Sequence, residues 1–186
     1  MKKLISLTLC LIMAFSLVSF AETAAKEEVG SLEVNGAFTL KARVPEGYTV
    51  SLFYSDSLMS IWSIMSEDET KPIMSMVIAY DEAYADVERF NDLDDEALAE
   101  IEATYSEYEM EFGYTETKLG TKLLMATEVG DYQDYVSFFS IYMGYCIEFT
   151  LMSGVDTEAA LTAEDIELAI DFLSDLDFEP IEEAAE

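Results

Sequence analysis

The sequence has no histidine among its 186 residues. This absence excludes the Ser-His-Asp and Cys-His catalytic arrangements, and it removes the usual ligand of zinc enzymes and haem. A glycine-rich phosphate loop is also lacking, because Gly144 and Gly154 are isolated and no lysine follows them at a helix start. The chain therefore lacks the commonest hydrolytic and nucleotide-binding chemistry. We expect a protein that is not an enzyme and has no cofactor.

Basic residues are scarce. Nine Lys and Arg stand against 39 Asp and Glu, which gives a formal net charge of −30 at pH 7. A surface of this charge repels nucleic acid and anionic lipid headgroups, since either would bring phosphate against carboxylate. The expected partner is a neutral or basic protein, a peptide or a glycan, and no nucleic acid.

Cysteine is nearly absent as well, with two residues in the chain. Cys10 lies in an apolar N-terminal run, so its removal with that run would leave Cys146 without an intramolecular partner. Cys146 stands between Tyr145 and Ile147 in a predicted strand, and no base is near it in the sequence. We predict a small buried hydrophobic side chain rather than a nucleophile.

The N-terminus has the layout of a signal peptide. Lysines at positions 2 and 3 precede an uncharged, almost wholly apolar run over residues 4–20, and small residues stand at Ser19 and Ala21. This pattern predicts a secreted or extracytoplasmic protein, cleaved after Ala21, with no stable membrane insertion after cleavage. An uncleaved anchor is the alternative, since the run is just long enough to span a bilayer. Lipidation is not expected, because Cys10 lies inside the run.

The rest of the chain divides into three parts. Residues 22–31 are a short polar tether, residues 32–180 form a single α/β-sandwich domain, and residues 181–186 form an acidic tail. The apolar fraction of 51% is too high for a disordered chain.

Alternating and continuous apolar runs predict eight strands, and helical spacing predicts two helices. The first helix covers residues 95–112, with Asp94 as N-cap, an apolar seam that ends at Phe112, and Gly113 at the C-terminus. The second follows Thr162, which forms a capping-box spacing with Asp165. The predicted class is α+β: a mostly antiparallel sheet covered by two amphipathic helices. The strands cover residues 38–44, 50–54, 59–65, 73–80, 115–119, 122–129, 135–142 and 145–152.

Residues 38–48, which read Phe-Thr-Leu-Lys-Ala-Arg-Val-Pro-Glu-Gly-Tyr, begin an order of elements that resembles the PsbP-like α/β sandwich. Residues 118–120, Lys-Leu-Gly, and residues 176–178, Leu-Asp-Phe, continue the resemblance, which spans residues 37–178. The family includes small exported bacterial proteins. The resemblance implies a domain that binds a partner or assists assembly, and it transfers no catalytic residue.

Asp92, Asp95 and Glu96 form the one acidic run that looks like a calcium loop. An EF-hand needs glycine at its sixth position and glutamate at its twelfth, but these positions hold Ala97 and Ala103. Helix capping and the helix dipole explain the three acids. They remain weak candidates for a low-affinity divalent-cation site.

Tyrosine and phenylalanine are abundant, at eleven each, and suit a wet binding surface. Asp131, Tyr132, Asp134 and Tyr135 are the candidates, because they lie together in a predicted turn. The leading hypothesis is a secreted, highly acidic, non-enzymatic binding or assembly module. The alternatives are a hydrolase that uses carboxylates alone and the cation binder.

N-terminal sequencing of the exported protein tests the first of these expectations. Cleavage after Ala21 gives a product that begins at Glu22, because Ser19 and Ala21 supply the small side chains that the peptidase needs. A full-length product that requires detergent would instead establish the anchor.

Overall fold

The computed structural model describes residues 30–34, 37–42, 44–107, 110–117, 120–128, 135–154, 160–174 and 177–180. The predicted signal peptide, its cleavage site at Ala21 and the acidic tail lie outside these residues. Within the described ranges, no helix has both the length and the apolar character needed to cross a bilayer.

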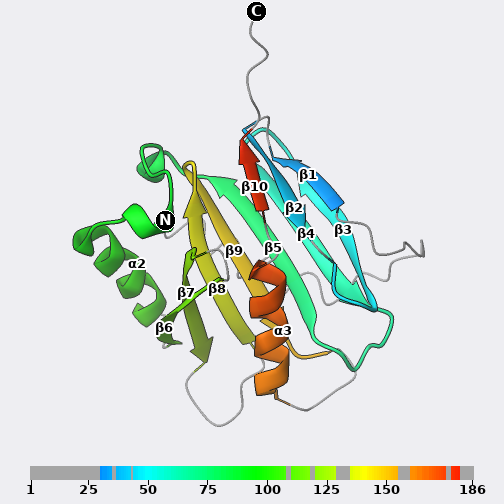
Figure 1. The fold of residues 1–186 in the computed structure, drawn as a ribbon. Helices are drawn as coiled ribbons and strands as arrows, with labels where there is room; N and C mark the ends of the chain where they lie inside the picture. The colour runs from blue at the N-terminus through cyan, green and yellow to red at the C-terminus, as the bar shows by residue number, and fades with distance from the viewer. Residues whose placement is uncertain are drawn as a thin grey trace, which may run out of the picture.

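A large antiparallel sheet forms the centre of the molecule (Figure 1). Its seven strands make six antiparallel pairings, with β3 and β6 at the two edges and β9 in the middle. The predicted α+β class with a mostly antiparallel sheet is confirmed. In spatial order the strands are β3 (Tyr48–Ser55), β4 (Met59–Ser66), β5 (Ile73–Tyr80), β9 (Tyr145–Met152), β8 (Tyr135–Tyr142), β7 (Lys122–Glu128) and β6 (Met110–Glu116).

A second, three-stranded sheet packs against one face of the large sheet. It consists of β1 (Gly30–Val34), β2 (Phe38–Ala42) and β10 (Asp177–Pro180), with β2 in the middle. Both pairings are antiparallel, and Phe178 of β10 lies opposite Leu40 of β2. Phe38 and Leu40 are fully buried in the main hydrophobic core.

Helix α3 (Ala163–Ser174) packs on the same face. Phe172 stacks on Phe149 of the central strand, with ring centroids 5.2 Å apart. The predicted capping box is present: the Thr162 backbone N–H donates to Asp165 Oδ2 at 2.8 Å, and the Asp165 N–H donates to Thr162 Oγ1 at 3.3 Å. These bonds satisfy two donors that a helix start leaves open.

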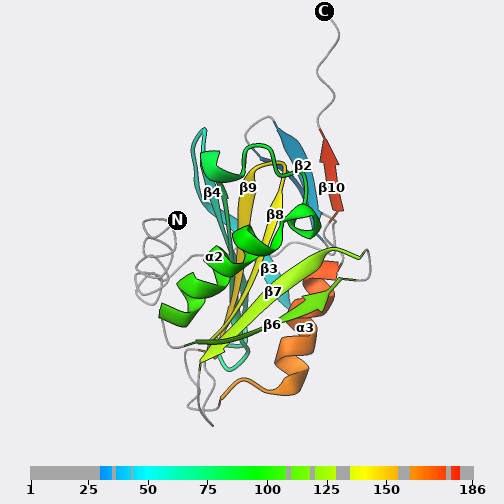
Figure 2. The ribbon, with the colours of Figure 1, turned by 90° about the vertical axis from the view of Figure 1, so that its left-hand side faces the viewer.

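The opposite face carries helix α2 (Asp95–Glu107) and the short 3₁₀ helices η1 (Glu82–Tyr84) and η2 (Phe90–Asp92). Figure 2 shows α2 and α3 on opposite sides of the large sheet. Ile101 and Tyr105 of α2 are buried in a second hydrophobic cluster with residues of β7, β8 and β9. Asp94 caps α2 as predicted, because its Oδ1 accepts the Ala97 N–H at 2.9 Å.

The first helix is shorter than predicted. It ends at Glu107, and Phe112 and Gly113 lie in β6 rather than on a helix seam and at its end. β6 pairs with β7 over its full length, and aromatic and β-branched residues in Met110–Glu116 favour a strand. The spacing of Phe112 from Tyr105 therefore matched a helical period by coincidence, and the strand predicted at residues 115–119 begins five residues earlier.

Gly154 should be a stability-critical position, because its α-carbon faces backbone atoms. A Cβ atom there would lie 2.6 Å from the Glu69 carbonyl oxygen and 2.7 Å from that of Lys71. Gly154→Ala should lower the free energy of unfolding by about 2–4 kcal/mol, since backbone must move. Gly113→Ala is the control, because nothing lies within 4 Å of its Cβ position. Urea unfolding measures both, and equal stability of the two variants would contradict this packing.

Candidate functional site

An exposed apolar surface lies at one edge of the large sheet. It consists of Leu52, Phe53 and Tyr54 in β3 and Leu58 in the turn to β4, which together we call the apolar edge. Their side chains are 50%, 44%, 43% and 58% exposed. Single exposed apolar residues are ordinary on a protein surface, but four within seven consecutive residues make this edge the candidate binding site.

A β-bulge places the side chains of the apolar edge on different sides. Leu52 lies opposite Trp62 and Tyr54 lies opposite Ile61, so Phe53 is the extra residue of β3. Directly opposed residues share a face of the sheet. Leu52 and Tyr54 therefore project to opposite faces, and the apolar edge extends around the rim of the sheet instead of along one side.

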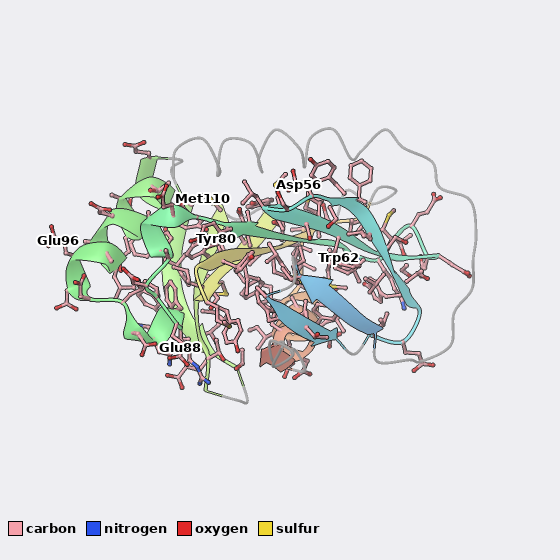
Figure 3. All side chains as sticks on the ribbon, turned by 90° about the horizontal axis from the view of Figure 1, so that it is seen from above. Asp56, Trp62, Tyr80, Glu88, Glu96 and Met110 are labelled. Atoms are coloured by element: carbon pink, nitrogen blue, oxygen red, sulfur yellow. The ribbon has the colours of Figure 1, made fainter. Side chains whose placement is uncertain are left out.

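Asp56 orders the turn that carries Leu58. Its Oδ1 accepts the backbone N–H groups of Leu58 and Met59, each at 2.8 Å, and its Oδ2 accepts the Tyr54 hydroxyl at 2.7 Å. The Tyr54 bond, followed by the two backbone bonds, lowers the pKa of Asp56, so this carboxylate stays ionised. Figure 3 shows Asp56 at this end of the sheet, away from Glu96 on α2.

The backbone of Leu58 is held from both sides. Its N–H donates to Asp56, and its carbonyl oxygen accepts the Tyr80 N–H at 2.8 Å. A large apolar side chain is thus presented to solvent by an ordered backbone. Such preorganisation lowers the entropy that binding would cost, because the surface needs no ordering when a partner arrives.

The opposite edge strand, β6, differs from β3 because it contains charged residues and because an exposed aromatic side chain there contacts other parts of the protein. Phe112 and Tyr114 in β6 are 38% and 40% exposed, but Glu111 and Glu116 lie in the same strand. The Tyr114 hydroxyl donates to Glu102 of α2, and Lys122 Nζ lies 4.1 Å from the Tyr114 ring centroid. These contacts occupy Tyr114 within the protein, so β6 is a poorer binding surface than β3.

A row of hydroxyl side chains crosses the interior of the large sheet. Cross-strand pairing aligns Ser51, Ser63, Ser75, Thr150 and Ser137 on neighbouring strands. All except Ser51 are buried, and the Ser75 hydroxyl makes no hydrogen bond. This row breaks the apolar character of the face that carries α2.

Glu148 lies next to this row and is the only buried acidic residue in the part of the chain that the structure describes. Its Oε1 accepts the Ser137 hydroxyl at 3.2 Å. The Tyr105 hydroxyl is close to both residues but makes no hydrogen bond of ordinary geometry, and burial, then Glu148, raises its pKa. A hydrolase that uses carboxylates alone would need a second carboxylate across a cleft from such a residue.

The predicted site residues that the structure describes, Asp92, Asp95, Glu96 and Tyr135, are not part of the apolar edge. Asp92 ends η2, where its Oδ2 accepts the Arg89 N–H at 3.1 Å, and Asp95 and Glu96 form the exposed first turn of α2. Among the described side chains, no group of three or more acids or cysteines is arranged to hold a metal ion. Tyr135 is the half-buried first residue of β8. Asp131, Tyr132 and Asp134 lie outside the described residues.

The apolar edge was missed in the sequence although a signal for it exists. Leu52, Phe53 and Tyr54 are consecutive, so they interrupt the alternation of a half-buried strand. Leu58 follows in a polar turn, where a large apolar residue has no core to enter.

Comparison of the chain with protein-family models, curated proteins and solved structures found no match.

Cys146 is buried in β9, as predicted for a small hydrophobic side chain. Burial, followed by the charge of Asp81, raises the pKa of its thiol to about 12. The reactive thiolate is therefore scarce at neutral pH.

The folded protein should accordingly react slowly with Ellman's reagent at pH 8, at a rate set by unfolding, and at once in urea. Absorbance at 412 nm, a property of the released reagent, measures both rates. Fast reaction without denaturant would contradict the burial of Cys146.

Proposed function

We propose that this chain is an exported, highly acidic binding or assembly module without enzymatic activity, and that its apolar edge binds a neutral or basic protein or peptide. The observation that carries the proposal is the ordered exposure of Leu52 and Leu58 in a chain of net charge −30. In a chain so rich in acidic residues, a group of exposed apolar side chains at one sheet edge supports a partner that covers it.

The charge narrows the class of partner. An approaching anion meets a net negative potential, whereas a cationic molecule is attracted and steered. A glycan is less well supported than a peptide, because a neutral sugar gains nothing from the negative potential, although Phe53 and Tyr54 supply aromatic rings to the apolar edge. A protein or peptide with apolar side chains and a positive charge fits both features of this surface.

The PsbP-like α/β sandwich remains the proposed fold family. An antiparallel sheet with α2 packed on one face and α3 on the other supports it. Members of that class usually bind or assist assembly, and this agrees with the surface described here.

Export is part of the same proposal. Lysines at positions 2 and 3, the apolar run over residues 4–20 and the small residues Ser19 and Ala21 support a cleaved signal peptide. The partner would then be an extracytoplasmic molecule.

Peptide and glycan arrays probed with the labelled protein test this function. We expect binding to peptides that combine apolar residues with lysine or arginine, and no binding to acidic peptides. Leu58→Lys and Leu52→Lys should each lower the affinity for the captured peptides by about tenfold, since each substitution removes a large apolar contact and places a polar group in the interface.

Phe112→Lys on the opposite edge is the matched control, because its exposure is similar but it lies on β6. It should leave peptide binding unchanged, and all three variants should keep the melting temperature of the parent protein. Equal loss in all three, or preferential binding to the glycan array, would refute the proposed surface.

A further inference from the structure

The backbone of β3 offers hydrogen-bonding groups as well as an apolar surface. In the described sheet β3 pairs with β4 alone, so every second residue of β3 directs its N–H and C=O away from its neighbour. From Tyr48 to Leu52 the register is regular over five consecutive pairs, and the bulge follows only after Leu52. This stretch of regular register can template another strand.

Proteins usually protect such edges from strand pairing. Charged side chains, proline, bulges or a covering element are the common devices. β3 has no charged residue and no proline in the sequence Tyr48–Ser55, and its bulge is confined to its second half. β6, the other edge, contains Glu111 and Glu116 and lies beside α2. Of the two edge strands of the large sheet, β3 is therefore the less protected against strand pairing.

Acidic side chains stand at both ends of the uncharged strand. Glu46 precedes β3 and Asp56 follows it, and both are exposed. Glu67 and Asp68 are exposed just after Ser66, which pairs with Tyr48. Lys71 also lies at this end, with its Nζ 6.0 Å from the Tyr48 ring centroid, so the three exposed acids Glu46, Glu67 and Asp68 exceed this one described cation by two. A segment laid along β3 therefore meets an apolar centre between two negative ends.

We infer that β3 binds its partner by strand addition, and that the partner segment is extended, uncharged and apolar in the middle, and basic at both ends. This inference rests on the proposed function and specifies its mode. Main-chain hydrogen bonds to β3 supply affinity, alternate side chains contact the apolar edge, and lysine or arginine side chains reach Glu46, Glu67 and Asp56.

A second copy of this chain fits the same edge poorly. Antiparallel pairing of two β3 strands would bring Glu46 of one copy near Asp56 of the other, and parallel pairing would bring like residues together. Both arrangements place carboxylates side by side between molecules of net charge −30. The charge thus favours a basic segment over self-association.

Fluorescence anisotropy with synthetic peptides tests binding by strand addition. The protein used is the purified protein obtained by expressing the full chain. The probe is a ten-residue peptide with alternating valine and threonine in its centre and two lysines at each end. A second peptide has the same side chains but N-methyl groups on alternate central amides, which remove main-chain donors. A third has glutamine in place of lysine.

We expect the N-methylated peptide to bind about tenfold more weakly than the parent, because two or more main-chain hydrogen bonds are lost. The glutamine peptide should also bind more weakly, and its affinity should not change with salt. Combined Glu46→Gln and Glu67→Gln should weaken the lysine peptide and leave the glutamine peptide unaffected, which assigns the ionic contribution to these residues.

Equal affinity of the N-methylated and parent peptides would overturn strand addition while leaving a side-chain binding surface intact. Failure of all three peptides, together with array binding that Leu58→Lys abolishes, would also overturn it. A stable dimer in sedimentation experiments, disrupted by Ser51→Lys, would assign the edge to a second copy. The proposed function itself fails on different results: preferential binding to the glycan array, or binding of the array peptides that does not depend on Leu52 and Leu58 more than on Phe112.

Discussion

The pairing of β9 with β5 on one side and β8 on the other is the interaction on which the rest of the structure depends. Each pairing is antiparallel and runs over all eight residues of β9, from Tyr145 to Met152. Phe149 and Leu151 are fully buried on the face that α3 and the small sheet contact. Cys146 and Glu148 point to the face of α2. One central strand thus links both hydrophobic clusters.

The extensive pairing of β9 at the centre of the sheet allows β3 to remain an exposed edge strand. Because β4 and β5 are anchored through β9, β3 can lose contact with the core toward its end and still pair with β4 on both sides of the bulge. The Asp56 turn then fixes the last part of the edge by hydrogen bonds alone. Rigid support under an apolar surface is the arrangement that binding sites require, since a loose edge would have to be ordered when the partner binds.

Local patterns predicted the central sheet well. The strands at residues 73–80, 135–142 and 145–152 have the predicted bounds, because near-continuous apolar runs between turns have few other interpretations. Met143 and Gly144 form the turn between the last two of these strands, and their positive φ angles of 49° and 78° suit a two-residue hairpin. The pairing of Phe178 with Leu40 could not be predicted, because it joins residues far apart in the chain. The apolar edge was missed because exposure depends on which strand lies at the edge.

Hydrogen exchange measured on the protein with and without the lysine-ended peptide tests the central claim most directly, because it reports main-chain hydrogen bonds residue by residue. Amides between Tyr48 and Leu52 should exchange more slowly when the peptide is bound, and amides of β6 should not change. Protection of β6, or peptide binding without any protection in β3, would contradict that claim.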